Sequence, residues 1–512
     1  MKPIDAELSL QQLDIVTNTS GNIVVSASAG TGKTRTMIAK IMQDLSENRT
    51  HKVIAAITFT RKATQEIRDR LTFDSSQCFI GTNNNFATDE VIKPFMKDVY
   101  GESFDIEMDT DYANKNRELK DFDEGVKSIE EYHTIYSYKN VKKNFVFDLA
   151  LDILKKSVAC RLYLQAKYCA IYIDEYQDCD IDMHNFLMHI SDDLKIKTFI
   201  VGDDKQSIFQ WKGAYPEVFK SIFVKENFTH KKLTMNHRSD KQIQDYSNLI
   251  FEETHPLVVN PQNCGNIIWI KATYDNWAGK VISLLDSEKT SALLRHTNTN
   301  AKTGADLLTK EGLEHIFIPK IPIENITTNT AWIYYAIASF VLLDTYSAYN
   351  FLNDIPVESD AFRVKEIKKI LNDIKQNAES ANQNAFNQSV NMLSGYLGYT
   401  TPKEHIDELY KTVTDKKFAV ALNPERPRHC ALTIHTSKGL EFEQVIIFIE
   451  DFAHNRELKE EHSKNHYVAC TRAESKLIIV DTNIAGARTA QNRLLEMFYK
   501  AGIDPDKLIS MQ

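Results

Sequence analysis

The sequence lacks a long hydrophobic run and any closely paired cysteines. Its most apolar stretch, residues 331–343, is too short to span a bilayer and is more typical of a buried helix. Seven cysteines are scattered without Cys-x-x-Cys spacing, which argues against a zinc site and a disulfide framework. Residues 1–10 carry acids and no apolar core, so we expect no secretory signal there. These absences favour a protein of the reducing cytoplasm with no membrane partner.

The sequence also lacks a net positive charge, because 70 acidic residues outnumber 61 lysines and arginines and give a formal net charge of −9. This balance argues against a generally basic nucleic-acid coat, although a local groove can still bind phosphates on an acidic protein. The chain has no evident internal repeat and no low-complexity segment. With 512 residues, 43% hydrophobic and 26% charged, it has the composition of an ordinary soluble protein. The length suggests about three or four domains.

The strongest motif is a small-residue loop between an apolar strand at residues 23–25 and a helix-like run at 35–45. The loop reads Ala27-Ser28-Ala29-Gly30-Thr31-Gly32-Lys33-Thr34, with Ala27 where such patterns usually begin with glycine. In loops of this kind, backbone N–H groups and the helix N-terminus bind phosphate oxygens, the lysine reaches the terminal phosphates and the threonine hydroxyl binds Mg²⁺. A plain strand-to-helix connector is the alternative. Gly-Lys-Thr at the junction favours a nucleotide site.

Two later apolar strands end in side chains suited to phosphoryl transfer. Residues 169–173 lead into Asp174 and Glu175, and residues 198–201 lead towards Gln206. Two adjacent carboxylates at the end of a buried strand can take different roles in phosphoryl transfer. Asp174 would hold the metal, and Glu175 would orient and deprotonate the attacking water. Gln206 has the reach to contact both the γ-phosphate and that water. The pattern predicts ATP hydrolysis.

Hydroxyl and aromatic side chains follow other strands, where they suit a phosphodiester backbone with an unstacked base. Residues 53–57 lead into Thr58 and Phe59 and then a charged helix through residue 71, and Phe209 and Trp211 lie just beyond Gln206. Each segment has an ordinary alternative, because hydroxyls also cap helices and aromatics also fill cores. Taken singly, none establishes a nucleic-acid contact.

The composition shifts between residues 98 and 131, where twelve acids face four basic residues. We find little strand or helix periodicity in this stretch and interpret it as an inserted subdomain or a partner surface. Its acidity makes it an unsuitable duplex-binding face.

In their order along the chain, these motifs resemble the UvrD/Rep-like branch of superfamily 1 helicases. The resemblance continues at residues 233–239 (LTMNHRS), 432–442 (LTIHTSKGLEF) and 467–473 (YVACTRA). The phosphate loop looks more like those of the RecB and AddA members than that of UvrD itself. The compact size resembles the helicase-like subunits of bacterial Gabija-type antiphage systems.

The resemblance implies an α/β fold of two RecA-like P-loop domains with parallel sheets, each carrying a small, mostly helical insertion. It places the first domain at 1–85 and 146–232 with its insertion at 86–145, and the second at 233–324 and 426–512 with a reduced insertion at 325–425. Short apolar runs at 267–270, 292–294, 430–434, 445–448 and 477–480 fit a parallel sheet covered on both faces. Helical stretches at 332–349 and 364–393 fit the second insertion. After Arg472 only a strand and a final helix are expected, with no room for a fused nuclease.

The resemblance also assigns site residues. For ATP it implies Gln12, Ser28, Ala29, Gly30, Thr31, Gly32, Lys33, Thr34, Arg35, His237 and Glu441, with Thr34 and Asp174 on Mg²⁺. For catalysis it implies Glu175 as base, Gln206 as sensor of the γ-phosphate, and Arg238 and Arg472 as arginine fingers from the second domain. For single-stranded DNA it implies Thr58, Phe59, Thr82, Phe86, Phe209, Trp211 and His435.

Four residues in three motifs depart from the family's usual residues. Asn84-Asn85 replaces His-Ser, Lys212 replaces an arginine and so lacks its bidentate fork, and His237 replaces a tyrosine that stacks on adenine. An imidazole ring can still stack in that place. We therefore expect a weaker contact at Lys212 and an adenine site that is otherwise retained.

The function that the resemblance implies is an ATP-dependent DNA translocase or helicase, moving 3′ to 5′ on single-stranded DNA by ATP hydrolysis between the two domains. A second hypothesis is an ATPase subunit that senses DNA ends or nucleotides and regulates a partner nuclease in an antiphage complex. A third is an ATPase scaffold that has lost its coupling to DNA. The expected partners are single-stranded DNA or DNA ends and a nuclease subunit.

Overall fold

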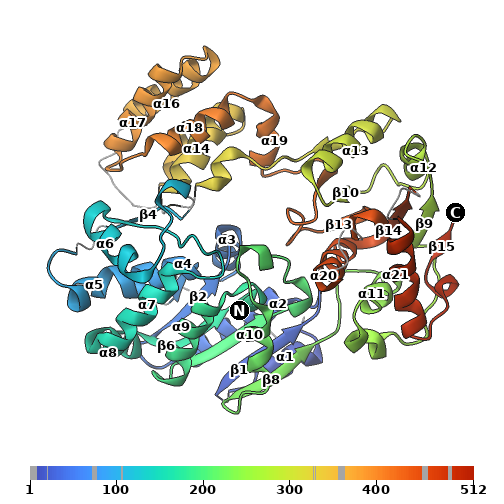
Figure 1. The fold of residues 1–512 in the computed structure, drawn as a ribbon, viewed down its shortest axis with the longest axis horizontal. Helices are drawn as coiled ribbons and strands as arrows, with labels where there is room; N and C mark the ends of the chain where they lie inside the picture. Colours follow the sequence, from blue (N-terminus) through green and yellow to red (C-terminus); the bar gives the residue numbers. More distant parts are fainter. Residues whose placement is uncertain are drawn as a thin grey trace.

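The computed structural model describes the chain from residue 8 to 512, except for residues 20, 72–77, 105–107, 113, 327, 329, 356–363, 453–458 and 483–486. Two α/β lobes lie side by side, and a separate helical bundle sits above the first (Figure 1). No helix in the described part of the chain is long and apolar enough to cross a bilayer. The expected α/β fold with two parallel sheets is confirmed.

A six-stranded parallel sheet forms the first lobe, in the order β3-β2-β6-β7-β1-β8. Its strands are β1 (Asn22–Ala27), β2 (Val53–Thr58), β3 (Cys78–Thr82), β6 (Tyr168–Ile173), β7 (Lys197–Gly202) and β8 (Phe228–Leu233). Successive side chains of a strand enter opposite cores, Val24 on one face and Val25 on the other, so the inner strands β1, β2 and β6 are mainly apolar, whereas the edge strand β8 carries polar residues in its middle. The order places the ends of β1, β7 and β6 next to one another.

Helices cover both faces of this first sheet. They are α1 (Leu10–Val16), α2 (Lys33–Glu47), α3 (Arg61–Arg70), α7 (Phe145–Lys156), α8 (Val158–Lys167), α9 (Ile181–Asp192) and α10 (Pro216–Ile222). The strands and the α2 and α3 helices expected in this lobe are confirmed.

A seven-stranded parallel sheet forms the second lobe, in the order β11-β12-β10-β13-β14-β9-β15. Its strands are β9 (Ile267–Lys271), β10 (Ser291–Arg295), β11 (Ile316–Phe317), β12 (His429–Thr433), β13 (Phe442–Phe448), β14 (Ala473–Asp481) and β15 (Ser510–Met511). Its helices are α11 (Lys241–Asn248), α12 (Trp277–Ile282), α13 (Asn298–Lys310), α20 (Lys459–Cys470) and α21 (Ala487–Lys500). The five expected strands are confirmed, as is the final helix; the two-residue edge strands β11 and β15 were not expected.

The segment 86–145, which we call the first insertion, shares its core with the first lobe. It contains the end of α4 (Asn83–Ala87), then α5 (Lys93–Tyr100), β4 (Asp109–Thr110), α6 (Phe122–Tyr132) and β5 (Thr134–Ile135). The acidic stretch is more regular than its sequence indicates, because α6 is a helix whose N-cap Asp121 accepts from the Glu124 N–H. Its buried Ile129 joins the core of the first lobe. The expectation of little periodicity there was wrong for α6.

The segment 325–425, called the second insertion, forms a helical bundle with its own core. Its helices are α14 (Ala331–Leu342), α15 (Ala348–Asn353), α16 (Val364–Glu379), α17 (Gln383–Tyr396), α18 (Lys403–Val413) and α19 (Ala419–Leu422). The helical stretch expected at 332–349 is interrupted after Leu342. The bundle lies against the first insertion (Figure 1), where the His405 imidazole is 3.5 Å from the Asp111 carboxylate.

Candidate active site

A cavity of about 840 Å³ lies between the two lobes, at the carboxyl ends of β1, β6 and β7. Residues of the first lobe line one side of the cavity. Residues that follow β8 in the chain, from His237 onwards, line the other side. Of the nucleotide and catalytic residues predicted from the sequence, the cavity brings together Gly30, Thr31, Gly32, Lys33, Thr34, Arg35, Asp174, Glu175, Gln206, His237, Arg238, Glu441 and Arg472. Residues more than four hundred positions apart in the chain therefore meet in one space.

The phosphate loop is shaped by two glycines with left-handed backbones, Gly30 at φ +71° and Gly32 at φ +76°. A Cβ at Gly30 would lie 2.2 Å from the Asn236 side-chain oxygen, so no larger residue fits there. The Gly30 carbonyl accepts from the His237 N–H at 2.8 Å. Gly32 is the N-cap of α2 and brings no side-chain acceptor to the first N–H groups of that helix. Such a helix start is suited to an anion.

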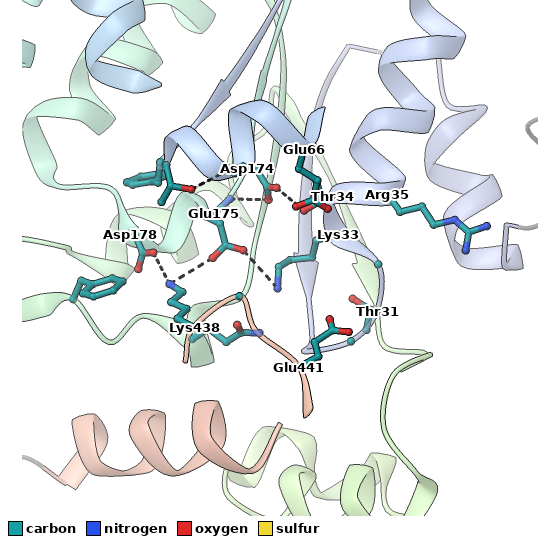
Figure 2. A pocket seen from close by; sticks show the side chains of 18 of the residues that line it. Thr31, Lys33, Thr34, Arg35, Glu66, Asp174, Glu175, Asp178, Lys438 and Glu441 are labelled. Carbon is teal, nitrogen blue, oxygen red and sulfur yellow. Dashed lines mark hydrogen bonds and ion pairs between the residues drawn. The ribbon is translucent and has the colours of Figure 1, made fainter. Parts of the chain in front are cut away.

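The Thr34 hydroxyl donates to Asp174 Oδ2 at 2.8 Å, directly beside the loop (Figure 2). Asp174 is 2% exposed, and burial together with the neighbouring Glu175 charge raises its pKa to about 6. A buried carboxylate of this kind gains from a divalent cation. The described residues contain no cluster of three or more His, Cys, Asp or Glu ligands. One carboxylate and one hydroxyl fit Mg²⁺, which usually completes its shell with phosphates and water.

The Glu175 carboxylate lies between two lysine side chains, one from each lobe. Lys33 Nζ lies 4.0 Å from Glu175 Oε1 and Lys438 Nζ lies 3.4 Å from Glu175 Oε2, on opposite sides of the carboxylate (Figure 2). Gln177 also donates to Glu175 Oε2 at 2.6 Å. Burial favours the neutral acid, but Lys33 and Lys438 outweigh it and hold the Glu175 pKa at about 2. Glu175 has a left-handed backbone, φ +52°, which is uncommon for a residue with a Cβ and is found at functional sites.

Lys438 is a site residue that sequence reasoning missed. It also pairs with Asp178, and its Nζ lies 5.1 Å from the centre of the Phe209 ring. The sequence did contain a clue to this residue, because Lys438 lies inside the helicase-like segment LTIHTSKGLEF and Asp178 ends the acidic turn after β6. One ammonium thus joins the acidic turn of the first lobe to the second lobe.

Arg238 and Arg472 of the second lobe line the cavity, and their guanidinium groups are bonded to acceptors of the protein itself. Arg238 pairs with Glu441 and donates to the Thr471 carbonyl at 3.3 Å. Arg472 is 1% exposed and donates to the carbonyls of Val468 and Leu440. Burial, with the charge of Arg238 next in importance, lowers the Arg472 pKa to about 10.

Gln206 belongs to a buried network that crosses between the lobes. Its amide donates to Asp203 Oδ2 at 2.8 Å, and the Tyr467 hydroxyl donates to the same oxygen at 3.4 Å. The Tyr467 hydroxyl accepts from the Ala29 N–H of the phosphate loop at 3.0 Å. Asp203 also pairs with Lys205 at 3.1 Å. Tyr467 was not predicted as a site residue, and it connects the loop, the Gln206 turn and α20.

Three residues assigned to ATP support the loop rather than line the cavity. The Gln12 amide donates to the Thr31 carbonyl at 3.1 Å and accepts from the Ser9 N–H at 2.9 Å. The Ser28 N–H donates to the Leu233 carbonyl, and the Ala29 N–H is taken by Tyr467. Their backbone and side-chain groups hold the loop in shape.

The residues assigned to DNA fall into three groups. Phe59, Phe209 and His435 line the cavity, and the exposed Trp211 lies edge-on to His435 with ring centres 6.2 Å apart. Thr58 is buried and bonded to Thr60 and Thr64, whereas Thr82 caps α4. Phe86 departs from the expectation.

Phe86 is a core residue. It is 1% exposed and packs against the rings of Phe79, Tyr168 and Phe186. A base has no access to a ring enclosed in this way, so the structure does not support a DNA contact at Phe86. An apolar side chain shortly after a strand is placed by packing, which the sequence alone does not reveal.

Comparison with known proteins finds matches to two family models, to a Gabija protein and to a DNA helicase. A family model described as an AAA domain matches residues 12–212, and one described as a UvrD-like helicase C-terminal domain matches residues 429–480. The Gabija protein GajB of Bacillus cereus is 39% identical over 474 residues, which cover 90% of this chain and 93% of that protein. The ATP-dependent DNA helicase PcrA of Staphylococcus aureus is 27% identical over 286 residues, 45% of this chain and 39% of PcrA.

Proposed function

Because the chain belongs to the family of Gabija protein GajB and is an ATP-hydrolysing helicase of the UvrD type, we propose that it moves along single-stranded DNA. The observation that carries the proposal is the cavity in which Lys33 and Glu175 of the first lobe meet Arg238 and Arg472 of the second. Closing and opening such a cleft changes the distance between two strand-binding lobes.

The roles of the cavity residues follow from their chemistry. The phosphate loop and Lys33 bind the ATP phosphates, and Glu175, kept ionised, orients the attacking water and accepts its proton. Mg²⁺, held by Thr34 and Asp174, would offset negative charge on the phosphates. Arg238 and Arg472 stabilise the charge that develops on the transferred group.

The adenine and the ribose of ATP are assigned to His237 and Glu441, two residues that line the cavity. His237 is exposed and lies beside Gly30, a position suited to stacking on adenine, and Glu441 is placed to hold the ribose. Gln206 contacts the γ-phosphate, and its hydrogen bond to Asp203 links this contact to Tyr467. These assignments rest on position and on the resemblance.

For the strand, Phe59, Phe209, Trp211 and His435 supply stacking surfaces beside the ATP cavity. Movement is 3′ to 5′, as the resemblance implies. We keep the division into a first domain at 1–85 and 146–232, a second at 233–324 and 426–512, and insertions at 86–145 and 325–425.

A second candidate function is regulation of a partner nuclease by sensing of DNA ends or nucleotides. It is favoured by the 93% coverage of a relative named as a Gabija protein, which places this chain in an antiphage defence family. We place this activity in the cytoplasm, where seven free thiols are compatible with the reducing conditions.

The experiment that tests the proposed function is ATP hydrolysis by the full chain with and without single-stranded DNA, at about 50 and 200 mM salt. We expect strong stimulation by the DNA, and a half-stimulating DNA concentration that rises about tenfold or more at the higher salt because phosphate contacts release counterions. Hydrolysis that is indifferent to DNA contradicts a motor and favours the nuclease-regulating hypothesis.

Tyr467→Phe tests the network between the lobes. The substitution removes one hydroxyl, which leaves the buried Ala29 N–H without its acceptor and takes from Asp203 one of its donors, while Gln206 still donates to Asp203 Oδ2. We expect kcat for DNA-stimulated hydrolysis to fall about 10-fold, equivalent to one lost hydrogen bond of ordinary strength, with little change in KM for ATP.

The control is Tyr246→Phe, which removes another buried hydroxyl of the second lobe, bonded to His466 Nε2 at 3.0 Å away from the cavity. Both variants should lose similar thermal stability, and only Tyr467→Phe should lose kcat. Equal kcat in the two variants contradicts a role for Tyr467 in positioning the loop and Gln206.

A further inference from the structure

A second cavity, also of about 840 Å³, lies where the first lobe and both insertions meet. We call it the amide pocket, because its walls include Asn83, Asn84 and Asn85 at the start of α4 and Asn144 before α7. Helix α14 of the second insertion closes it with Trp332 and Tyr335. None of the residues assigned from the sequence, apart from Phe59 and Thr82, lines this pocket.

We propose that the amide pocket binds an unstacked base of single-stranded nucleic acid. The proposal rests on the proposed function and assigns the second insertion a direct grip on the strand. Its grounds are the chemistry of the walls, an unsatisfied buried amide, and the wall that the pocket shares with the ATP cavity.

The walls suit a base and exclude a phosphate. Among the described residues that line the pocket there is no lysine or arginine, and two carboxylates, Asp180 and Asp354, are present. A phosphate would be repelled, whereas a neutral base offers donors and acceptors that match side-chain amides and a π face that stacks on Trp332 or Tyr335. Asp180 is partly committed, since it accepts from Asn144 Nδ2 at 2.9 Å.

Asn83 adds an independent indication of a polar occupant. Its side chain is 9% exposed, and its Oδ1 has no hydrogen-bond partner among the described residues. Its Nδ2 contacts only the weak acceptor Met183 Sδ, at 3.1 Å. Leaving a buried amide in this state is unfavourable, and a hydrogen-bonding ligand in the adjoining pocket relieves the cost.

Trp332 is held in place before any ligand arrives. Its ring lies edge-on to Tyr399, with centres 6.0 Å apart, and tilted against Phe351 at 6.2 Å, both in the second insertion. The indole is therefore fixed by the core of the bundle and presented to the pocket wall. A preorganised aromatic side chain loses little entropy when a base stacks on it.

The pocket is a neighbour of the ATP cavity and shares part of its wall. Phe59 and Asp180 line both spaces. Strands β2 and β3 pair in register from Ile54↔Cys78 to Thr58↔Thr82, so the turns after them, which carry Phe59 and Asn83, lie side by side. The Phe59 ring thus lies between the amide pocket and the cavity lined by Phe209 and His435, so a strand stacked beside the ATP site can extend from the first lobe towards α14.

The test compares Trp332→Ala with Trp332→Phe, which keeps a stacking face, in the full chain. Fluorescence anisotropy measures binding to a labelled oligo(dT) and to an abasic oligonucleotide of the same length and charge. We expect Trp332→Ala to weaken oligo(dT) binding about 10-fold, within the range for one stacked base, and to leave abasic binding unchanged. Trp332→Phe should stay within about 3-fold of the wild type, and the salt dependence should not change, because no cation is lost.

Ser339→Phe provides a second variant that adds bulk to the pocket wall and removes no aromatic packing. It should weaken oligo(dT) binding to a similar extent. Wild-type affinity in both Trp332→Ala and Ser339→Phe overturns the proposal, as does an equal loss on the abasic strand, which would indicate a disturbed fold or a peptide-binding role. The motor function is judged separately, by stimulation of ATP hydrolysis at saturating DNA. Stimulation retained in Trp332→Ala with weakened binding supports both ideas, and stimulation absent from the wild type overturns the motor alone.

Discussion

Glu175→Gln is expected to lower kcat for ATP hydrolysis by about 10²- to 10⁴-fold, the usual contribution of a general base. The amide keeps the shape of the side chain and its bond to Gln177, but it no longer accepts a proton. Lys33, whose ammonium lies 4.0 Å from the carboxylate, loses this anionic partner and becomes available to phosphates, whereas Lys438 keeps its pair with Asp178. Nucleotide affinity should therefore be retained or raised while turnover is lost.

The measurement is steady-state hydrolysis in saturating single-stranded DNA beside direct binding of a fluorescent ATP analogue. The matched control is Glu47→Gln at the far end of α2, where the carboxylate accepts only from Gln43 within its own helix. That variant should hydrolyse ATP at the wild-type rate. A Glu175→Gln protein that keeps more than about a tenth of the activity contradicts the assignment of Glu175 as the base.

Much of this site could be predicted from the sequence because it is local. Lys33 follows β1 within one loop, and Asp174 and Glu175 follow β6 directly, so a buried parallel strand delivers each side chain to the same edge of the sheet. Continuous apolar runs likewise identified the central strands of both sheets. The edge strands β11 and β15 were missed because two residues leave no periodicity to detect.

The contacts between distant segments could not be predicted in this way. The bond from the Ala29 N–H to Tyr467 joins residues 438 positions apart, and the Lys438 pair with Asp178 depends on how the two lobes meet. The position of Phe86 was decided by packing against Tyr168, another residue distant in sequence. The walls of the amide pocket come from the first lobe and from both insertions, whose residues are far apart in the sequence. The asparagines and Trp332 could not be assigned to one pocket before the fold brought these parts together.

Arg238→Ala is expected to lower kcat by about 10³- to 10⁵-fold, the range measured for arginine fingers in other phosphoryl-transfer enzymes. Arg238 enters the cavity from the second lobe, where its guanidinium pairs with Glu441 and donates to the Thr471 carbonyl. We expect a bound triphosphate to compete with Glu441 for that guanidinium, which would free Glu441 to bind the ribose. Arg238→Lys should recover only part of the loss, since an ammonium keeps the charge without the planar, bidentate geometry.

The control is Arg428→Ala, which removes an exposed arginine of the same lobe that pairs with Glu288 outside the cleft. Surface pairs of this kind contribute little, so the control should fold and hydrolyse ATP like the wild type. Binding of the ATP analogue distinguishes the explanations for a slow Arg238→Ala protein. Near-normal affinity with a large loss of kcat means that Arg238 acts in the transition state. A loss confined to affinity would instead make the pair of Arg238 and Glu441 a ground-state nucleotide contact, leaving Arg472 as the sole arginine assigned to transition-state charge.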